Sequence, residues 1–281
     1  MLGPGTTVTH AAIRALAENG CLVMWCGEGA VRFYAQGLGE TRRSRNLLRQ
    51  ASLVSDPALR MGVVRKLYQM RFAELLDESL SLREIRGKEG IRVRMAYAKA
   101  SRESGVEWKG RVYKRDGWGA ADPANRALSA ANSCLYGVCQ AGIVSSGYSP
   151  ALGFIHTGRM LSFVYDVADL YKTEVTVPAA FRAAAEGRTD LESRVRHHCR
   201  DLFGETRLLS RIQTDLEAIM ATDGLDLPGD ADPDSDPAAP GGLWDPEAGE
   251  VAGGQSYGHE PGGGDSGGAD DPGEGADTTS G

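Results

Sequence analysis

Lysine and arginine are absent from the last sixty residues of this 281-residue chain, whereas Asp and Glu occur there fifteen times. Residues 1–221 therefore hold all 31 basic residues and only 23 of the 38 acidic ones, which gives this body a net charge of +8. The whole chain has a net charge of −7, so the acidic tail hides a basic body. A surplus of Lys and Arg favours binding to the phosphate backbone of nucleic acids.

Aliphatic residues are also scarce after residue 221, where Gly, Pro and Asp dominate. Such a segment cannot bury enough apolar surface to offset the entropy lost on ordering, so we predict that residues 222–281 are disordered. The simplest role for this segment is a solubilising tail. Alternatively, it competes with DNA for the basic body, or docks a partner through Leu243 and Trp244.

Cysteine occurs five times, an odd number, and no CxxC pair is present. This usage argues against a disulfide framework and against a cysteine-based zinc site. We find no secretory leader pattern and no apolar run that approaches the length of a membrane span. We therefore expect a cytoplasmic protein with free thiols and no membrane segment.

Hydrophobic periodicity predicts an α+β chain in three parts. Residues 1–38 are predicted to form a helix (Thr9–Asn19) and two strands (21–26 and 30–36) that are rich in β-branched and aromatic residues. Residues 39–221 are predicted to be mainly helical and to form a catalytic domain. The helical segments expected there are 42–54, 57–76, 81–104, 125–147, 161–170 and 191–203. The third part is the tail.

Three side chains of possible chemical use, His156, Asp166 and Asp169, lie within fourteen residues. The two Asp residues are spaced i,i+3 on the predicted helix Leu161–Leu170, so they share one face. Adjacent carboxylates repel unless a cation or proton lies between them, and Mn²⁺ or Mg²⁺ suits oxygens plus one imidazole. The alternative is a solvated acidic face beside a structural His. Their apolar neighbours favour the first interpretation, because half-buried acids need partners.

Long motifs surround these residues: NSCLYG at 132–137, GYSPALGFIHTG at 147–158 and LSFVYDVADLYK at 161–172. Together they resemble the type I-E form of CRISPR-associated protein one, the spacer-acquisition integrase and endonuclease. The resemblance spans residues 1–221. Further matching segments are WCGEGAVRFYAQG, VVRKLYQMRF, REIRGKEGIRVR, GVEWKGRVY, VPAAFRAAAEG and RVRHHCRDLF.

This resemblance implies a metal-dependent enzyme of CRISPR adaptation. The family's Glu, His and Asp ligands for Mn²⁺ or Mg²⁺ correspond to Glu89, His156 and Asp169, and Asp166 matches a further acidic position needed for activity. Spacing alone would make Glu89 a surface residue that pairs with a neighbouring Arg. The implied reaction is attack of a 3′-hydroxyl of foreign DNA on the CRISPR repeat. The implied partners are double-stranded DNA (protospacer and repeat), a second copy in a homodimer, and CRISPR-associated protein two.

Contacts to DNA are also predicted. The candidates are Arg14, Arg32, Arg159, Lys172, Arg196 and Tyr136, the first two from positions that the family uses for phosphate. A second group mixes aromatic rings with cations, which suits base stacking plus phosphate neutralisation or an ordinary basic hairpin. It consists of Trp108, Lys109, Arg111, Tyr113, Lys114 and Arg115.

The chain departs from the family at its beginning, where most of an N-terminal β-domain has no counterpart. We expect residues 1–38 to be a remnant of that domain with uncovered strands. We also expect the chain alone to aggregate or to fail to dimerise. Two rival functions remain open: a catalytically inert DNA-binding fragment, and a stand-alone nuclease on branched DNA.

Deletion of residues 222–281 should leave the melting temperature nearly unchanged, because the tail buries little surface. It should tighten non-specific DNA binding at low salt, because fifteen acidic groups no longer compete with the +8 body, and the gain should shrink as salt rises. Fluorescence anisotropy across a salt series measures the affinity for DNA and its dependence on salt. Loss of DNA binding after the deletion would make the tail a recognition element.

Overall fold

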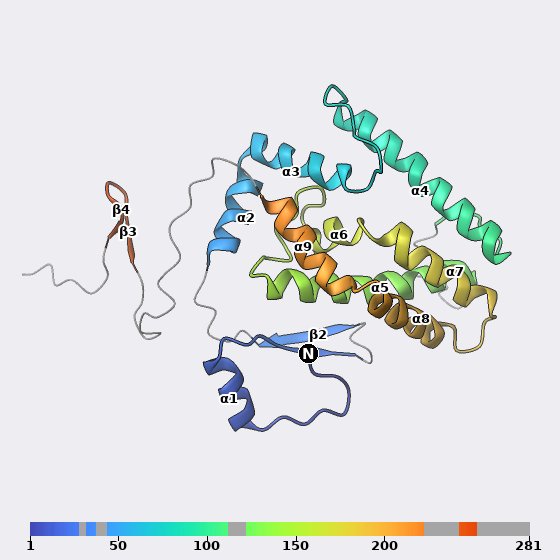
Figure 1. The fold of residues 1–281 in the computed structure, drawn as a ribbon, viewed down its shortest axis with the longest axis horizontal. Helices are drawn as coiled ribbons and strands as arrows, with labels where there is room; N and C mark the ends of the chain where they lie inside the picture. The colour runs from blue at the N-terminus through green and yellow to red at the C-terminus, as the bar shows by residue number, and fades with distance from the viewer. Residues whose placement is uncertain (28–31, 38–43, 112–121, 222–241, 252–281) are drawn as a thin grey trace, which may run out of the picture. The chain divides into compact units, whose positions relative to one another are not determined.

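The computed structural model describes residues 1–27, 32–37, 44–111, 122–221 and 242–251. The chain forms two units, Met1–Ser235 and Asp236–Gly281, and each is described by itself. The first unit is mainly helical with one small sheet (Figure 1), so the α+β prediction is confirmed.

The described elements of the first unit follow one another in chain order as a helix, a β-hairpin and then a run of helices. They are α1 (His10–Glu18), β1 (Val23–Cys26), β2 (Phe33–Gly37), α2 (Arg45–Ser55), α3 (Pro57–Gln69), α4 (Leu82–Ser104), α5 (Pro123–Ser145), α6 (Ser162–Ala168), the π-helix η3 (Lys172–Thr176), α7 (Val177–Ala185), α8 (Leu191–Glu205) and α9 (Leu208–Met220).

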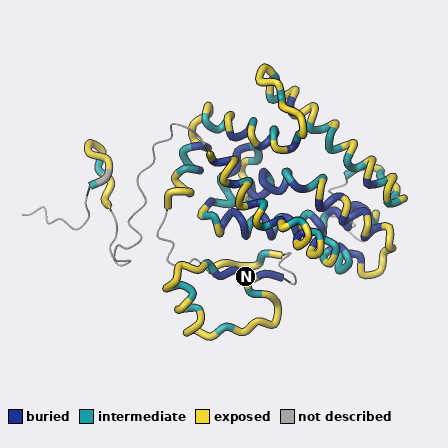
Figure 2. The backbone as a smooth tube through the Cα atoms, viewed as in Figure 1, coloured by how far each residue is buried: buried dark blue, intermediate teal, exposed yellow. Residues whose placement is uncertain are grey.

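Helix α5 lies at the centre of this unit and contacts α6, α7, α8, α9 and η3. It begins where the Asp122 side chain accepts a hydrogen bond from the Asn125 amide, with Pro123 in the first turn. By length and composition α5 could cross a membrane, which corrects our expectation that no apolar run comes close. However, 61% of its apolar window is buried within the protein (Figure 2), as in the central helix of a folded core.

The β-hairpin packs one face on α5. Strands β1 and β2 pair antiparallel, and Met24 and Cys26 form a small apolar cluster with Ala141 of α5. Gly137 permits this approach, because a Cβ atom there would lie 2.9 Å from the Phe33 amide nitrogen. The opposite face exposes Trp25, so the expected uncovered apolar side chains are present.

Helices α4 and α6 lead to the functional site, and α4 has strong end signals. Helix α4 begins with a capping box, in which Ser81 and Glu84 each bond the other's backbone, and ends at Gly105 in the left-handed conformation. Helix α6 is shorter than predicted and ends at Ala168. A single π-helical turn then connects it to α7, and such turns are frequent at functional sites.

Several expectations differ from the structure. Helix α3 ends at Gln69 instead of continuing to residue 76. Helices α7 and α9 were not predicted. Within the tail, residues 243–251 form a β-hairpin, β3 (Leu243–Asp245) paired with β4 (Gly249–Val251), which corrects the prediction of disorder for this stretch. Its Trp244 is largely exposed. Residues 222–241 and 252–281 lie outside the described residues.

Gly137, which is buried in α5, tests the contact between α5 and the hairpin, and Gly62, which is exposed in α3, is the control. Gly137→Ala should lower the free energy of unfolding by about 1–3 kcal/mol, because the new methyl group meets the β2 backbone. Gly62→Ala in α3 should raise it by up to about 1 kcal/mol, because nothing lies within 4 Å and Ala favours helix. Urea denaturation followed by circular dichroism measures both. Equal effects of the two changes would contradict the close packing.

Candidate active site

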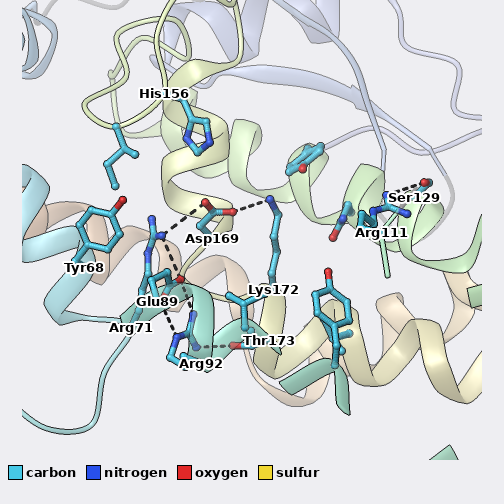
Figure 3. A pocket seen from close by; sticks show the side chains of 16 residues that line it. Tyr68, Arg71, Glu89, Arg92, Arg111, Ser129, His156, Asp169, Lys172 and Thr173 are labelled. Atoms are coloured by element: carbon cyan, nitrogen blue, oxygen red, sulfur yellow. Dashed lines mark hydrogen bonds and ion pairs between the residues drawn. The ribbon is translucent and has the colours of Figure 1, made fainter. Parts of the chain in front are cut away.

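A pocket of about 620 Å³ lies between α4, α5 and the residues around the end of α6 (Figure 3). The predicted ligands Glu89, His156 and Asp169 all line it, although Glu89 is far in sequence from the other two. The charged residues of its lining are Arg71, Glu89, Arg92, Arg111, His156, Asp169 and Lys172.

Asp166 is fully buried in α6, and its carboxylate organises the preceding loop. It accepts hydrogen bonds from the backbone amides of Phe154 (2.6 Å), Ile155 (3.0 Å) and His156 (2.9 Å). The imidazole Nδ1 of His156 adds a fourth contact at 2.7 Å. A buried carboxylate needs such partners. Because these groups already satisfy its oxygens, the expectation of one cation shared by Asp166 and Asp169 is wrong.

The loop from Gly153 to His156 is also held from the other side. Arg60 of α3 donates from Nε and Nη2 to the carbonyl oxygen of Phe154, at 3.0 and 2.9 Å. A Cβ atom on Gly153 would lie 2.3 Å from the carbonyl oxygen of His156, so only glycine fits. Donors and acceptors of one short backbone segment are thus tied to two helices, which fixes where the imidazole points.

His156 therefore has a defined orientation. With Nδ1 directed at Asp166, Nε2 is the nitrogen left for a ligand. The hydrogen bond to Asp166 raises the pKa of His156; partial burial opposes this, and the charge of Asp169 adds to it. Tyr165 lies edge-on to the imidazole, with ring centroids 5.7 Å apart. The sequence left this orienting partner of His156 unidentified.

Glu89 faces the pocket from α4, and its side chain is only 14% exposed. Arg92, one turn further on, donates to both carboxylate oxygens from Nε (2.8 Å) and Nη2 (2.9 Å). Arg92 also donates from Nη1 to the hydroxyl of Thr173 in η3. The i,i+3 pair with Arg is thus present, but it lies inside the site and fixes Glu89 to the π-helical turn.

Asp169 follows α6 and contacts two cations. Lys172 Nζ is 2.6 Å from its Oδ1, and Arg71 Nη1 is 3.7 Å from its Oδ2. Burial disfavours the charged form of Lys172, but Asp169 and Tyr136 beside it raise the Lys172 pKa overall. The Lys172 ammonium also lies 5.1 Å from the centre of the Tyr136 ring. Both Lys172 and Tyr136, predicted as DNA contacts, therefore line the pocket.

The donor set suits a hard divalent cation, since it offers two carboxylates and one imidazole with its second nitrogen engaged. Across the described parts of the chain, however, no three His, Cys, Asp or Glu side chains are grouped closely enough to hold a metal as they stand. The reason is visible in Figure 3: the carboxylates of Glu89 and Asp169 turn to Arg71, Arg92 and Lys172.

The other predicted DNA contacts lie elsewhere. Arg14 is exposed on α1 and pairs with Glu18 at 3.4 Å. Arg159 is exposed in the turn before α6. The pKa of buried Cys134 in α5 is lowered mainly by its hydrogen bond to Cys199, and the charges of Arg32 and Arg196 lower it further, whereas burial raises it. Both arginines therefore lie near the middle of α5. None of these positions is tested as a DNA contact.

The predicted stacking group is partly engaged inside the protein. Trp108 stacks on Tyr97 with centroids 4.6 Å apart and lies edge-on to Phe181, so its ring packs on the core. Arg111 donates to Asn125 and Ser129 of α5. The ring of Trp108 therefore contacts other rings within the protein, and its use for base stacking stays a prediction. Tyr113, Lys114 and Arg115 lie outside the described residues. Lys109 is exposed and pairs with Glu107 at 3.1 Å.

Sequence reasoning missed Arg71 and Arg92 as site residues. Both belong to motifs that carry the resemblance, but each lies in a predicted helix with other charged residues nearby. Nothing in their spacing distinguishes them from arginines exposed to solvent. Only the fold brings Arg71, which follows α3, and Arg92 of α4 to the carboxylates.

Known proteins resemble this chain along most of its length. Residues 68–195 match the family model of CRISPR associated protein Cas1. The chain is 58% identical over 277 residues to the CRISPR-associated endonuclease Cas1 2 of Thermus thermophilus, covering 98% of this chain and 81% of that protein. This chain belongs to the Cas1 family. It is also 44% identical over 228 residues to the Cas1 endonuclease of Escherichia coli, across 81% of this chain and 75% of that protein.

Solved Cas1 structures share the fold. A crystal structure of a TtCas1–DNA complex superposes with a TM-score of 0.74 at 58% identity, over 80% of this chain and 83% of that chain. A casposase bound to integration product superposes with a TM-score of 0.55 at 16% identity, covering 76% of this chain and 80% of that chain, which shows a shared fold only.

The contact between His156 and Asp166 predicts a titration. Asp166→Asn should lower the His156 pKa more than Asp169→Asn does, because the hydrogen bond is the larger cause. With a raised pKa, the pair stabilises the fold fully below about pH 6.5, and this contribution is lost as pH rises through the folded-state pKa. Histidine NMR titration of the metal-free protein measures the shift. A larger drop in Asp169→Asn would contradict the orienting role of Asp166.

Proposed function

We propose that this Cas1-family chain is a divalent-metal-dependent DNA endonuclease and integrase of CRISPR adaptation. In this proposal it joins the 3′-hydroxyl of a foreign DNA fragment to the CRISPR repeat by transesterification. The observation that carries it is the gathering of Glu89, His156 and Asp169 in one pocket from three separate segments of the chain. The cofactor would be Mn²⁺ or Mg²⁺, held by these three side chains.

Each side chain has a distinct role in this proposal. His156 presents Nε2, because Asp166 holds Nδ1. Arg92 orients Glu89 through two hydrogen bonds, and Lys172 orients Asp169. Held by these side chains, a divalent cation would supply Lewis-acid chemistry that polarises a phosphodiester and would stabilise charge on the phosphate and the leaving oxygen. The residues of the chain position the ligands and supply positive charge around the phosphate.

The charge of the site supports a phosphate substrate. Three cationic side chains, Arg71, Arg92 and Lys172, contact two carboxylates, Glu89 and Asp169. The lining is therefore already balanced toward positive charge before any metal adds to it. Such a pocket attracts an anion, and the basic body of residues 1–221 extends that attraction over a longer DNA segment.

The partners follow from the same proposal. Its substrates are double-stranded protospacer and repeat DNA, and the DNA complex of the similar Thermus protein supports this class of ligand. A homodimer, a complex with CRISPR-associated protein two, the type I-E form and a cytoplasmic location complete the proposal. The predicted phosphate contacts Arg14, Arg32, Arg159 and Arg196 remain proposals of the same kind.

Two other functions are distinguishable by experiment. A stand-alone nuclease on branched DNA would use the same pocket without forming a complex with CRISPR-associated protein two. An inert DNA-binding fragment would bind DNA yet show no Mn²⁺-dependent strand transfer. The satisfied, oriented His156 favours an active site over an inert one, because a purely DNA-binding surface has no need of a buried carboxylate to fix an imidazole.

Replacing the proposed ligands should abolish strand transfer. Glu89→Ala, His156→Ala and Asp169→Ala should each reduce Mn²⁺-dependent joining by at least about 100-fold, because each change removes one metal ligand. Asp166→Asn should be milder in metal affinity but still slow. A gel assay with labelled DNA, in the presence of CRISPR-associated protein two, measures the product.

Glu103→Ala provides the matched control. Glu103 lies on the same helix as Glu89, but it is exposed and pairs only weakly with Lys99 at 3.8 Å. This change should leave joining unaltered. Near-normal activity in any one of the three ligand variants would remove that residue from the proposed site.

A further inference from the structure

Arg71 differs from the other cations of the pocket in how it is held. It follows the C-terminal end of α3, and its side chain is only 3% exposed. Its Nε atom is buried without a hydrogen-bond partner among the described residues. A buried guanidinium with an unused donor is costly, so its position requires a compensating attraction.

The attraction comes from two carboxylates at once. Nη1 of Arg71 lies 3.4 Å from Glu89 Oε1 and 3.7 Å from Asp169 Oδ2. Nη2 approaches the carbonyl oxygen of Asp166 at 3.5 Å, and the guanidinium lies 4.9 Å from the centre of the Tyr68 ring. One nitrogen therefore bridges Glu89 and Asp169, as Figure 3 shows.

These contacts are long compared with those of the neighbouring cations. Charged N–H···O hydrogen bonds usually measure about 2.7–2.9 Å. Arg92 meets Glu89 at 2.8 and 2.9 Å, and Lys172 meets Asp169 at 2.6 Å. Arg92 and Lys172 each dock firmly on one carboxylate, whereas Arg71 bonds loosely to both. Its contribution is charge between the two carboxylates more than a fixed hydrogen bond.

We propose that Arg71 is a positioning residue that acts as the internal counter-cation of the site. It holds Glu89 and Asp169 together when no metal is bound, and a divalent cation displaces its guanidinium from the bridging position. This inference rests on the metal site proposed above. It explains why two partly buried ligand carboxylates share one cation, and why no metal-ready grouping exists among the described residues while Arg71 bridges them.

A direct consequence is competition between Arg71 and the metal. The cation must replace the guanidinium and also approach a like charge, and both effects weaken binding. Neutral replacements at this position should therefore bind metal more tightly. If Arg71 instead pre-organised the ligands for the metal, neutral replacements would bind it more weakly, so the two roles predict opposite signs.

Calorimetric titration of the full 281-residue chain with Mn²⁺ alone, without DNA, measures this sign. Arg71→Met and Arg71→Gln should each tighten Mn²⁺ binding by about tenfold or more, which corresponds to about 1.4 kcal/mol. Arg71→Lys keeps the charge and should stay within about threefold of the natural protein. Arg92→Gln is the matched control, because it removes a cation that contacts only one of the two carboxylates, Glu89; it should not tighten binding.

Melting temperature gives a second readout that does not depend on activity. The Arg71→Met and Arg71→Gln proteins should melt lower than the natural protein without metal, because two partly buried carboxylates lose their bridge, and saturating Mn²⁺ should raise their melting temperature more. If both variants are unfolded without metal, recovery of the fold by Mn²⁺ supports the inference, and failure to recover overturns it.

The outcomes separate the two levels of the argument. If the natural protein does not bind Mn²⁺, the proposed metal site fails and the inference fails with it. If the natural protein binds Mn²⁺ but the neutral Arg71 variants bind equally or more weakly, the inference alone is overturned. Equal tightening in Arg92→Gln would reduce the effect to general charge and would also overturn the special position of Arg71.

Discussion

The buried carboxylate of Asp166 is the interaction on which the site depends. It accepts three backbone amides and one imidazole nitrogen, all within 3.0 Å, and lies in a helix surrounded by apolar residues. A charge in such surroundings is tolerated only because these donors replace water. In exchange, the carboxylate fixes the loop that precedes α6 and the direction of the His156 ring. Loss of this one side chain would leave several buried amides without acceptors.

Other buried polar groups extend the same constraint. Gln50 of α2 is fully buried, donates to the carbonyls of Ser149 and Leu152, and accepts from the Ser149 amide. Arg60 of α3 donates to the next carbonyls along the chain. The segment between α5 and α6 is therefore tied to three helices by its backbone. Loops that carry functional side chains are usually more mobile than their scaffold, and these bonds explain how this loop can place an imidazole reproducibly.

The charges of the pocket follow a second rule. Carboxylates that would hold a divalent cation repel one another when it is missing, so the protein supplies cations of its own. Arg92 and Lys172 do this from fixed positions, and Arg71 does it from between the carboxylates. The same excess of positive charge suits a DNA phosphate. The side chains that neutralise the carboxylates can thus also attract a phosphate. For this reason the pocket contains more cationic side chains than the two carboxylates need for neutralisation.

Local sequence was sufficient for much of the helical architecture. The Ser81–Glu84 capping box predicts the start of α4, and Asp122 with Pro123 predicts the start of α5. Both signals can be found in the sequence because they act within one helical turn. Helix α7 was missed although it is amphipathic, with Pro178 and Arg182 exposed and Phe181 buried, because its nine residues give only a short periodic signal. Family resemblance, not spacing, identified Glu89 as a site residue.

Tertiary structure decided how the site residues relate to one another. The i,i+3 spacing of Asp166 and Asp169 is visible in the sequence, but only the fold shows that Asp166 bonds the preceding loop whereas Asp169 lines the pocket. The bridging position of Arg71 arises because the residue after α3 meets Glu89 of α4 and Asp169, which are 18 and 98 residues further along the chain. The amino-acid sequence shows which charged residues are present. Which of them pair depends on burial and on distances, and these arise only when segments far apart in sequence pack together.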